Sequence, residues 1–323
     1  MQYINNLRGL AILLIILTHI ISLYHLDNDA FRVVANLLSN STVTFVMVAG
    51  FLFFHLTEKF HYFRFLKGKA RSILIPYLFF SIPAILMYTL GLKNSHAWID
   101  LAQLEAENNI IGQVAFYLAT GAHLGPFWFI PMIFLVYLVS PVLFWLKKGH
   151  AILLVTAVLL IVSFIIGRPE LDDNTLQSFI FFLPTFLIGM ILAKYNVTMT
   201  MKVMPILSAY IIVLLAVYFF VDVSSSLDLV MKMVLSTLLF FLFKNTFNTP
   251  NKYLGLMARL SFYLFFVHGF IIGALRMAIP TEHFVMPLLT VPILFSLVIF
   301  MCLSIYVGLR MVFGERIRLF IGY

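Results

Sequence analysis

Long apolar runs separated by short polar segments dominate the chain. Most runs are about 20 residues long, the length that an α-helix needs to cross the hydrocarbon core of a bilayer. They lack the alternation of apolar and polar residues that is typical of a transmembrane β-strand. The runs and the breaks between them predict ten membrane-spanning helices, at residues 8–25, 33–56, 72–91, 127–146, 150–167, 176–193, 203–221, 227–243, 254–276 and 286–312.

Composition agrees with this pattern. Of the 323 residues, 63% are hydrophobic and 11% are charged, with a mean hydropathy of +1.05, whereas roughly a quarter of a soluble domain is charged. We therefore expect an all-α polytopic membrane protein, with residues 1–323 as a single integral-membrane domain. The longest outer segment, 92–126, is polar enough to cap a site. Within it, "IIGQVAFYLATGA" at 110–122 is expected to form a short re-entrant or interfacial helix.

The distribution of Lys and Arg predicts an orientation. With a cytoplasmic N-terminus, 16 of these residues fall on the cytoplasmic side and 5 outside. Membrane proteins carry this excess on the cytoplasmic side, so both termini are expected to be cytoplasmic. The net charge of +8 is then a loop bias of a protein in a bilayer, and no nucleic-acid partner is expected.

The first apolar run, "NLRGLAILLIILTHI" at 6–20, carries Arg8 at its start and His19 well inside it. Eleven residues are almost three helical turns, so the two side chains share a face and lie ~16 Å apart along the axis. An ionisable group at that depth usually faces the bundle interior or a wet cavity. The shared face suits the wall of a tunnel that admits an anionic cofactor from the cytoplasm. Alternatively, Arg8 anchors the helix at the membrane surface and His19 makes a contact between helices.

Other chemistry finds little support in the sequence. The outer histidines, His25, His96, His123 and His283, are spread out and lack carboxylates at ligand spacing, so no metal site is predicted. Cys302 is the only cysteine and matches no metal motif. The sequence lacks Gly-x-Ser-x-Gly, P-loop and dinucleotide-binding motifs, which argues against soluble-type hydrolases, ATPases and dehydrogenases.

Five segments, taken in order, resemble acyltransferase family 3, the multispanning bacterial membrane acyltransferases. The first segment has the family's Arg, ten residues, then His. It is followed by "FVMVAGFLFFH" at 45–55, "LKGKARSILIPYLFF" at 66–80, "GPFWFIPMIFLVYLVSP" at 125–141 and "LSFYLFFVHGFII" at 260–272. The resemblance covers nearly the whole chain.

Two positions depart from the family's pattern. The family often has Ser where Ala49 stands. It often shows Arg-x-x-Arg in the basic stretch, where this chain reads Lys67-Gly-Lys69-Ala-Arg71. The exact transfer of roles within that stretch is therefore left open.

The resemblance implies transfer of an acyl group, usually acetyl, from a cytoplasmic acyl-coenzyme A. The acceptor would be a hydroxyl of an extracytoplasmic carbohydrate or a lipid-linked glycan, and the location a bacterial cytoplasmic membrane. His19 and Arg8 are the expected catalytic residues, with neutral His19 as the base that takes the hydroxyl proton. Arg8, Lys69 and Arg71 are expected to bind the coenzyme phosphates. The basic stretch would equally serve to fix topology and contact anionic lipid.

His268 also lies deep in a predicted helix, and Ser261 precedes it by seven residues on the same face. His268, Ser261 and Trp128 are expected to bind the acceptor, with Tyr137 along the same path. For His268, a second acid–base role or simple packing are the alternatives. Aromatic residues near helix ends often anchor a protein at the membrane interface instead.

Two other functions compete with acyl transfer. A transporter or exporter of a glycan or lipid-linked intermediate would also suit ten helices with intramembrane Arg and His. Against it, deep charge is sparse and no inverted repeat is visible. The other alternative is an assembly subunit of a polysaccharide machine with a degenerate site, which the presence of Arg8 and His19 disfavours.

Overall fold

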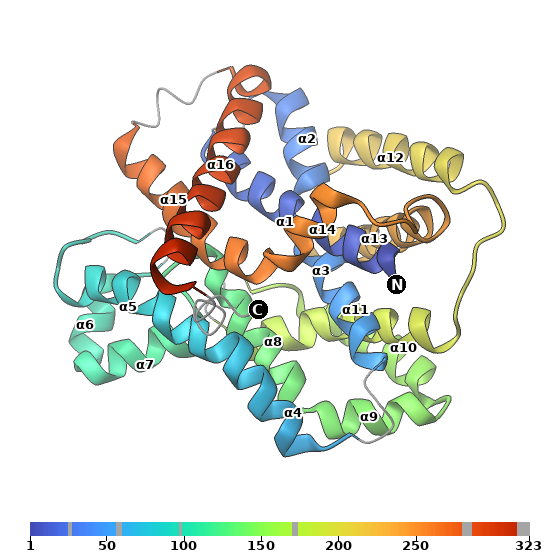
Figure 1. The fold of residues 1–323 in the computed structure, drawn as a ribbon, viewed down its shortest axis with the longest axis horizontal. Coiled ribbons are helices and arrows are strands. Elements are labelled where there is room, and N and C mark those ends of the chain that lie inside the picture. Colours follow the sequence, from blue (N-terminus) through green and yellow to red (C-terminus); the bar gives the residue numbers. More distant parts are fainter. Residues whose placement is uncertain (25–27, 56–59, 97–98, 170–173, 280–285, 315–323) are drawn as a thin grey trace.

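The computed structural model describes residues 1–24, 28–55, 60–96, 99–169, 174–279 and 286–314. Within these ranges every regular element is helical (Figure 1). The α-helices are α1 (Gln2–Ile21), α2 (Asp29–Leu38), α3 (Thr42–Phe54), α4 (Tyr62–Lys69), α5 (Ile75–Thr89), α6 (Leu101–Glu107), α7 (Ile110–Thr120), α8 (Phe129–Leu138), α9 (Ser140–Lys148), α10 (Ala151–Ile166), α11 (Thr175–Lys194), α12 (Val203–Phe220), α13 (Ser225–Thr246), α14 (Lys252–Arg259), α15 (Ser261–Ala278) and α16 (Pro287–Phe313). A π-helical turn, η1 (Ala70–Leu74), and a 3₁₀ turn, η2 (Gly125–Trp128), complete the set.

The predicted all-α membrane architecture is confirmed. Eight helices of the described chain are long and apolar enough to cross a membrane. A ninth span is formed if α7 and the η2–α8 segment count together, although they are bent by 73° to each other. The shorter apolar helix α10 lies at the remaining predicted span. Helices α3 and α11 pack together inside the bundle, whereas α12 and α16 lie at its edge (Figure 1).

The predicted helix at 33–56 is broken into α2 and α3. At the break, Asn40 adopts a left-handed backbone conformation with φ of 55°. The hydroxyls of Ser39 and Ser41 donate to backbone carbonyls three residues earlier, which competes with continued helix formation. The ammonium of Lys232 in α13 donates to the last carbonyls of α2. Side chains therefore satisfy the backbone groups that the break leaves unpaired.

The basic segment before the predicted helix at 72–91 is itself helical. Helix α4, the π turn η1 and helix α5 run on without interruption from Tyr62 to Thr89. The predicted start of this helix, residue 72, is therefore ten residues too late, because the basic stretch ahead of it belongs to the same helix. The π turn lies immediately after Lys69, and such turns often occur at functional sites.

Helices α1 and α15 run in the same direction through the bundle. The guanidinium carbon of Arg8, early in α1, lies 5.5 Å from the ring centre of Phe262, early in α15. Farther along both helices, the ring centres of His19 and His268 are 5.3 Å apart. Both ionisable residues of α1, Arg8 and His19, therefore face α15. It begins six residues earlier than predicted and ends at Ile21.

Candidate active site

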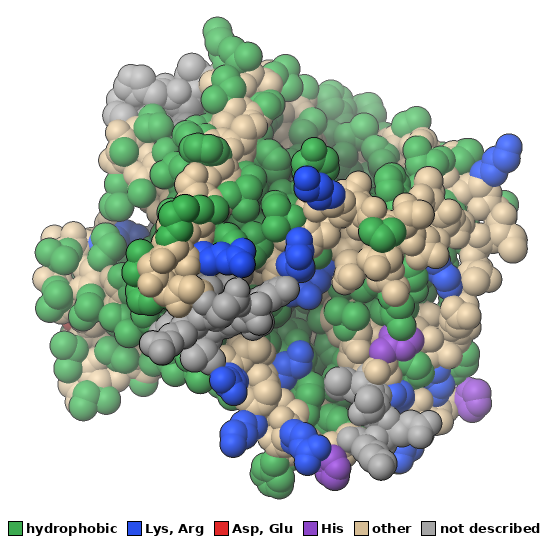
Figure 2. Space-filling model, viewed as in Figure 1, with side chains coloured by type: hydrophobic (Ala, Val, Ile, Leu, Met, Phe, Trp, Pro, Cys, Tyr) green, Lys and Arg blue, Asp and Glu red, His purple; other side chains and the backbone are tan. Residues whose placement is uncertain are grey.

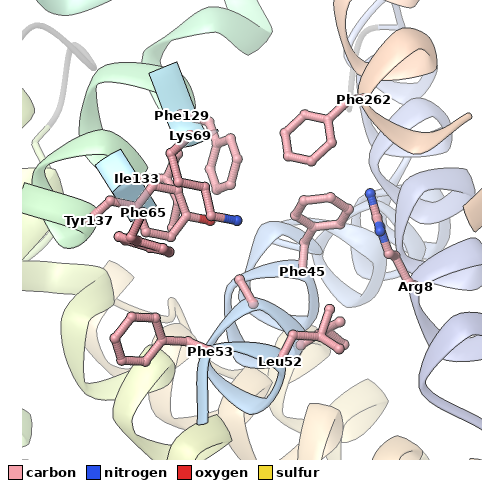
Figure 3. A pocket seen from close by; sticks show the side chains of 12 residues that line it. Arg8, Phe45, Leu52, Phe53, Phe65, Lys69, Phe129, Ile133, Tyr137 and Phe262 are labelled. Atoms are coloured by element: carbon pink, nitrogen blue, oxygen red, sulfur yellow. The ribbon is translucent and has the colours of Figure 1, made fainter. Parts of the chain in front are cut away.

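A cavity of about 200 Å³ lies among α1, α3, α4, α8 and α15 (Figure 3). Its wall is mainly aromatic and aliphatic, with a cation on each of two sides. The lining residues are Arg8, Phe45, Val48, Ala49, Leu52, Phe53, Phe65, Lys69, Phe129, Ile133, Tyr137 and Phe262.

Arg8 and Lys69 reach into this cavity from opposite sides, with their nitrogen ends directed at its interior (Figure 3). Each cation lies over an aromatic ring: the Arg8 guanidinium over Phe262, and the Lys69 ammonium 4.8 Å from the ring centre of Tyr137. The lining contains no Asp or Glu, and neither cation pairs with a carboxylate among the described residues. Because a partly buried charge without a counter-ion is costly, the cavity favours an anionic ligand.

Arg71 lies apart from the other two predicted coenzyme ligands. Its side chain is exposed and does not line the cavity, whereas Lys69 is half-buried in the cavity wall. Residues two apart on a helix do not share a face. The structure thus brings Arg8 and Lys69 together and leaves Arg71 on the surface.

His19 and His268 form a pair deep in the bundle. Their ring centres are 5.3 Å apart and their planes are inclined by 48°. His268 is fully buried, whereas His19 is partly exposed. The sequence predicts that both lie at similar depth, and the structure places them in contact. Two imidazole rings, each with one nitrogen that donates and one that accepts in the neutral form, therefore meet at one point.

The backbone fixes the protonation pattern of the His268 ring. Its Nδ1 lies 2.8 Å from the carbonyl oxygen of Leu264, and because a carbonyl only accepts, Nδ1 donates. In the neutral ring Nε2 is then an acceptor. This buried Nε2 has no hydrogen-bond partner in the described chain. It remains available to a proton donor that enters the site.

Aromatic rings separate the histidine pair from the cavity. Neither His19 nor His268 lines the cavity. Phe129, in the cavity wall, has its ring centre 5.5 Å from that of Phe265, which lies 6.1 Å from His268. Phe45 packs edge-on against Phe129 at 5.8 Å. The single tunnel expected along the face of α1 is therefore divided by a group of phenylalanines in this structure.

The predicted acceptor ligands lie in different surroundings. Trp128 is buried and stacks on Phe182. The guanidinium carbon of Arg168 lies 4.9 Å from the centre of the Trp128 ring. A series of ring contacts, from Trp128 through Phe129 and Phe265 to His268, connects Trp128 with the histidine pair. Ser261 is fully buried with its hydroxyl unpartnered among the described residues. Tyr137 lines the cavity with Arg8 and Lys69 instead.

Sequence reasoning missed the aromatic residues that shape the cavity. Phe45 and Phe262 fall within two of the segments quoted above, but each looks like an ordinary apolar residue in a membrane helix. Their signal was position alone, because Phe262 follows the predicted acceptor ligand Ser261 and stands six residues before His268. Their role depends on which helices meet, and apolar periodicity does not carry that information.

Two outer histidines hold the polar segment between α5 and η2 in place. The ring of His123 bridges the hydroxyl of Ser81 and the carbonyl of Tyr117, at 2.8 and 3.0 Å. His96 donates from Nε2 to the carbonyl of Ala122 at 2.8 Å. Across the described residues, no group of three or more His, Cys, Asp and Glu is placed to hold a metal ion. These histidines therefore fix the segment next to the bend between α7 and α8.

Comparisons with known proteins complete this description. Neither the curated proteins nor the solved structures provide a match to the chain. A family model described as an acyltransferase domain matches residues 1–307, a range that includes the cavity, both histidines and most of α16. The chain is therefore a multi-pass membrane protein that belongs to acyltransferase family 3.

Proposed function

We propose that this acyltransferase moves an acyl group, acetyl in the simplest case, from cytoplasmic acyl-coenzyme A to a hydroxyl of an extracytoplasmic or lipid-linked carbohydrate. The observation that carries the proposal is the arrangement along α1. One helix brings Arg8 to a carboxylate-free cavity and His19 into contact with the buried His268. A thioester donor with phosphates at one end and a reactive carbonyl at the other fits this arrangement, with the phosphates near Arg8 and the carbonyl near His19.

His19 acts as the general base in the proposed reaction. Its neutral ring takes the proton of the acceptor hydroxyl while the hydroxyl oxygen attacks the thioester carbonyl. The carbon–oxygen bond forms, the carbon–sulfur bond breaks, and the thiolate leaves with the proton returned by His19. His268 contacts the His19 ring. In the proposed reaction its Nε2 accepts a hydrogen bond from the His19 ring or from the acceptor, and so holds that group in position. The products are the acyl ester and free coenzyme A.

The donor enters from the side of Arg8 and Lys69. The lysine-rich and arginine-rich side of the chain is cytoplasmic under the positive-inside rule, which places these cations at the coenzyme's entrance. Arg8 faces the anionic part of the donor, and the acylated arm lies between the aromatic walls beside Lys69. Phe45 and Phe129 separate this cavity from the histidines, so the acyl end displaces these rings to reach His19.

The acceptor approaches the histidines from the opposite side. Trp128 is buried between Phe182 and the guanidinium of Arg168, so its ring positions that guanidinium. In the proposed complex the guanidinium donates hydrogen bonds to the hydroxyls of the acceptor sugar. This side is extracytoplasmic in the proposed orientation, in a bacterial cytoplasmic membrane.

The test uses purified protein in nanodiscs with radiolabelled acetyl-coenzyme A. Replacement of His19 by Asn is expected to lower coenzyme A release by about 10²–10⁴-fold, the usual contribution of a positioned base, while donor binding persists. Arg8→Gln is expected to weaken donor binding, because a charge-assisted contact to phosphate is lost. His150→Ala serves as the control, because His150 is an exposed histidine far from α1 in the sequence.

Either of two results would overturn the proposal. The first is a folded wild-type protein that neither binds nor cleaves acetyl-coenzyme A. The second is His19→Asn with wild-type turnover. A wild-type protein that moves a glycan across vesicles without consuming the thioester would favour a transporter.

A further inference from the structure

A second cleft, of about 680 Å³, opens beside the start of α1. It lies between the first turns of α1, the segment ahead of α14, α14 itself and the start of α15. Its volume falls within the range of small-molecule sites. The lining residues are Gln2, Asn5, Asn6, Arg8, Pro250, Asn251, Lys252, Gly255, Ala258, Arg259 and Phe262.

The cleft is polar and positively charged. Three cations line it, Arg8, Lys252 and Arg259, and no Asp or Glu is among its lining residues. Lys252 and Arg259 are seven residues apart, about two helical turns, so they share one face of α14. Figure 2 shows Lys and Arg side chains gathered beside a hollow in the region of α14, with no Asp or Glu visible around it. This arrangement favours a ligand with more than one negative charge.

The walls of the cleft are held in fixed positions. A Cβ at Gly9 would lie 2.2 Å from the carbonyl oxygen of Leu254, so α14 rests directly on α1 at this glycine. The side-chain amide of Asn6 donates to the carbonyls of Phe247 and Thr249 at 2.8 and 2.9 Å, which ties the segment before α14 to α1. The cleft is therefore preformed.

Side chains, and not the helix terminus, provide the charge of the cleft. The side-chain oxygen of Asn251 already accepts from the backbone N–H groups of Tyr253 and Leu254. The first backbone donors of α14 are thus partly satisfied within the protein. An anion in the cleft would meet the ammonium and guanidinium groups of the lining instead.

The cleft and the aromatic cavity share a wall. Arg8 and Phe262 line both, so the guanidinium of Arg8 stands at the boundary between a polar compartment and an apolar one. Acyl-coenzyme A has the same two parts, a nucleotide with phosphates and a long arm that ends in the thioester. The order of the compartments along α1 matches the order of these parts.

We propose that the cleft between α1 and α14 binds the phosphorylated nucleotide end of the donor, with Lys252 and Arg259 contacting its phosphates. Arg8 stands where the arm passes into the aromatic cavity. This inference rests on the proposed function, because it takes acyl-coenzyme A as the donor. It assigns the nucleotide to residues of α14, and leaves Lys69 for the arm.

Two independent variants test the assignment. The double variant Lys252→Gln/Arg259→Gln removes the charge. Gly255→Leu fills the cleft, because a Cβ at Gly255 meets no atom within 4 Å. Both are expected to raise KM for acetyl-coenzyme A about tenfold or more and to weaken competition by adenosine 3′,5′-bisphosphate. Turnover of S-acetyl-pantetheine, which lacks the nucleotide, is expected to stay at the wild-type level.

The controls are Lys202→Gln, an exposed lysine outside the cleft, and Gly308→Leu, a helical glycine of α16 that also has open space around it. Unchanged KM for acetyl-coenzyme A in both cleft variants would overturn this inference and leave the proposed function standing. Equal losses with acetyl-coenzyme A and S-acetyl-pantetheine would also overturn it, since the effect would not depend on the nucleotide. Failure of the wild-type protein with every thioester would overturn both.

Discussion

Lys69 and Arg71 illustrate how much a spacing of two residues matters on a helix. Both belong to the basic stretch that was expected to meet the coenzyme as one group. Lys69 lines the aromatic cavity beside Tyr137, whereas Arg71, the second residue of the π turn, is exposed. Residue type and proximity in sequence therefore do not distinguish a ligand from a surface charge. The helical register does.

These two residues make a matched pair for measurement. Lys69→Met keeps most of the apolar side-chain volume and removes the charge, so it is expected to raise KM for acetyl-coenzyme A several-fold to about tenfold. Arg71→Met removes the same charge from the surface and is expected to change KM by less than about twofold. Steady-state kinetics in nanodiscs at fixed salt would compare them. Equal increases in KM for the two variants would show that Lys69 and Arg71 act only through the electrostatic potential of the protein surface, and not through direct contact with the donor.

His96 needs its neutral form to hold the outer segment. Its Nε2 donates to the carbonyl of Ala122, while its Nδ1 accepts from the backbone N–H of Ile99 at 3.2 Å. Partial burial lowers the pKa of His96 below its usual 6.5, the bond to Ala122 opposes this shift, and nearby Lys93 adds to it. Protonation at Nδ1 removes the acceptor that Ile99 uses.

The sign of the resulting pH effect follows from that lowered pKa. The unfolded chain binds the proton more readily, so the contribution of His96 to stability is complete above about pH 6.5 and is lost as the pH falls through the lower folded value. Thermal unfolding in detergent between pH 8 and pH 5 should show a smaller acid-induced fall in Tm for His96→Asn than for the wild-type protein. Parallel curves for the two would contradict this role.

At the scale of elements, the break between α2 and α3 depends on a residue of α13. Lys232 is 3% exposed, donates to the carbonyls of Asn36 and Leu37, and lies 4.0 Å from Asp228. Asp228 in turn accepts from Tyr218. The hydroxyl of Thr18, next to His19, donates to the carbonyl of Leu38 at the end of α2. This polar group therefore supports the helix end against which the part of α1 that carries His19 packs.

Loss of this ammonium group should destabilise the fold. Lys232→Met removes the side-chain donor to the carbonyl of Leu37 and leaves the carbonyl of Asn36 with the Ser39 hydroxyl alone. It is expected to lower the free energy of unfolding by about 1–3 kcal/mol. The measurement is thermal unfolding in detergent, with Lys202→Met as the exposed control. Restoration of Tm by the added change Asp228→Asn would show that the unpaired carboxylate contributes to the loss. A Lys232→Met protein as stable as the control would refute the role of this group.

Helix existence was predictable from sequence, whereas helix interruption was not. Runs of apolar residues near 20 in length identify the spans because backbone groups in lipid must be paired within a helix. The break at Asn40 is stabilised partly by Lys232, which lies 196 residues from Asn36. The continuation of α5 back to Tyr62 places a basic and aromatic segment in a helix that hydropathy alone assigns to a loop. Both differences arise from tertiary contacts.

At the scale of the whole molecule, one face of α1 carried most of the predictable site. The eleven-residue spacing predicted that Arg8 and His19 share a face, and the structure places Arg8 in the cavity wall and His19 beside His268. The sequence predicted a similar depth for His19 and His268, but not their contact. The approach of Lys252 and Arg259 to Arg8 was not predictable, because about 250 residues separate them in the chain. The position of the phenylalanines between the cavity and the histidines was also not predictable, because it depends on contacts between helices that are distant in sequence.

Coenzyme A that has lost its acyl group keeps the nucleotide that the cleft between α1 and α14 is proposed to hold. Most of the binding contacts then lie far from the atoms that react, so substrate and product are held almost equally well. Such uniform binding stabilises the bound state without accelerating the reaction. Free coenzyme A would accordingly compete with the donor, and the rate of acylation would follow the ratio of acylated to free coenzyme in the cytoplasm. The surface chemistry of the cell would in this way be coupled to its carbon supply.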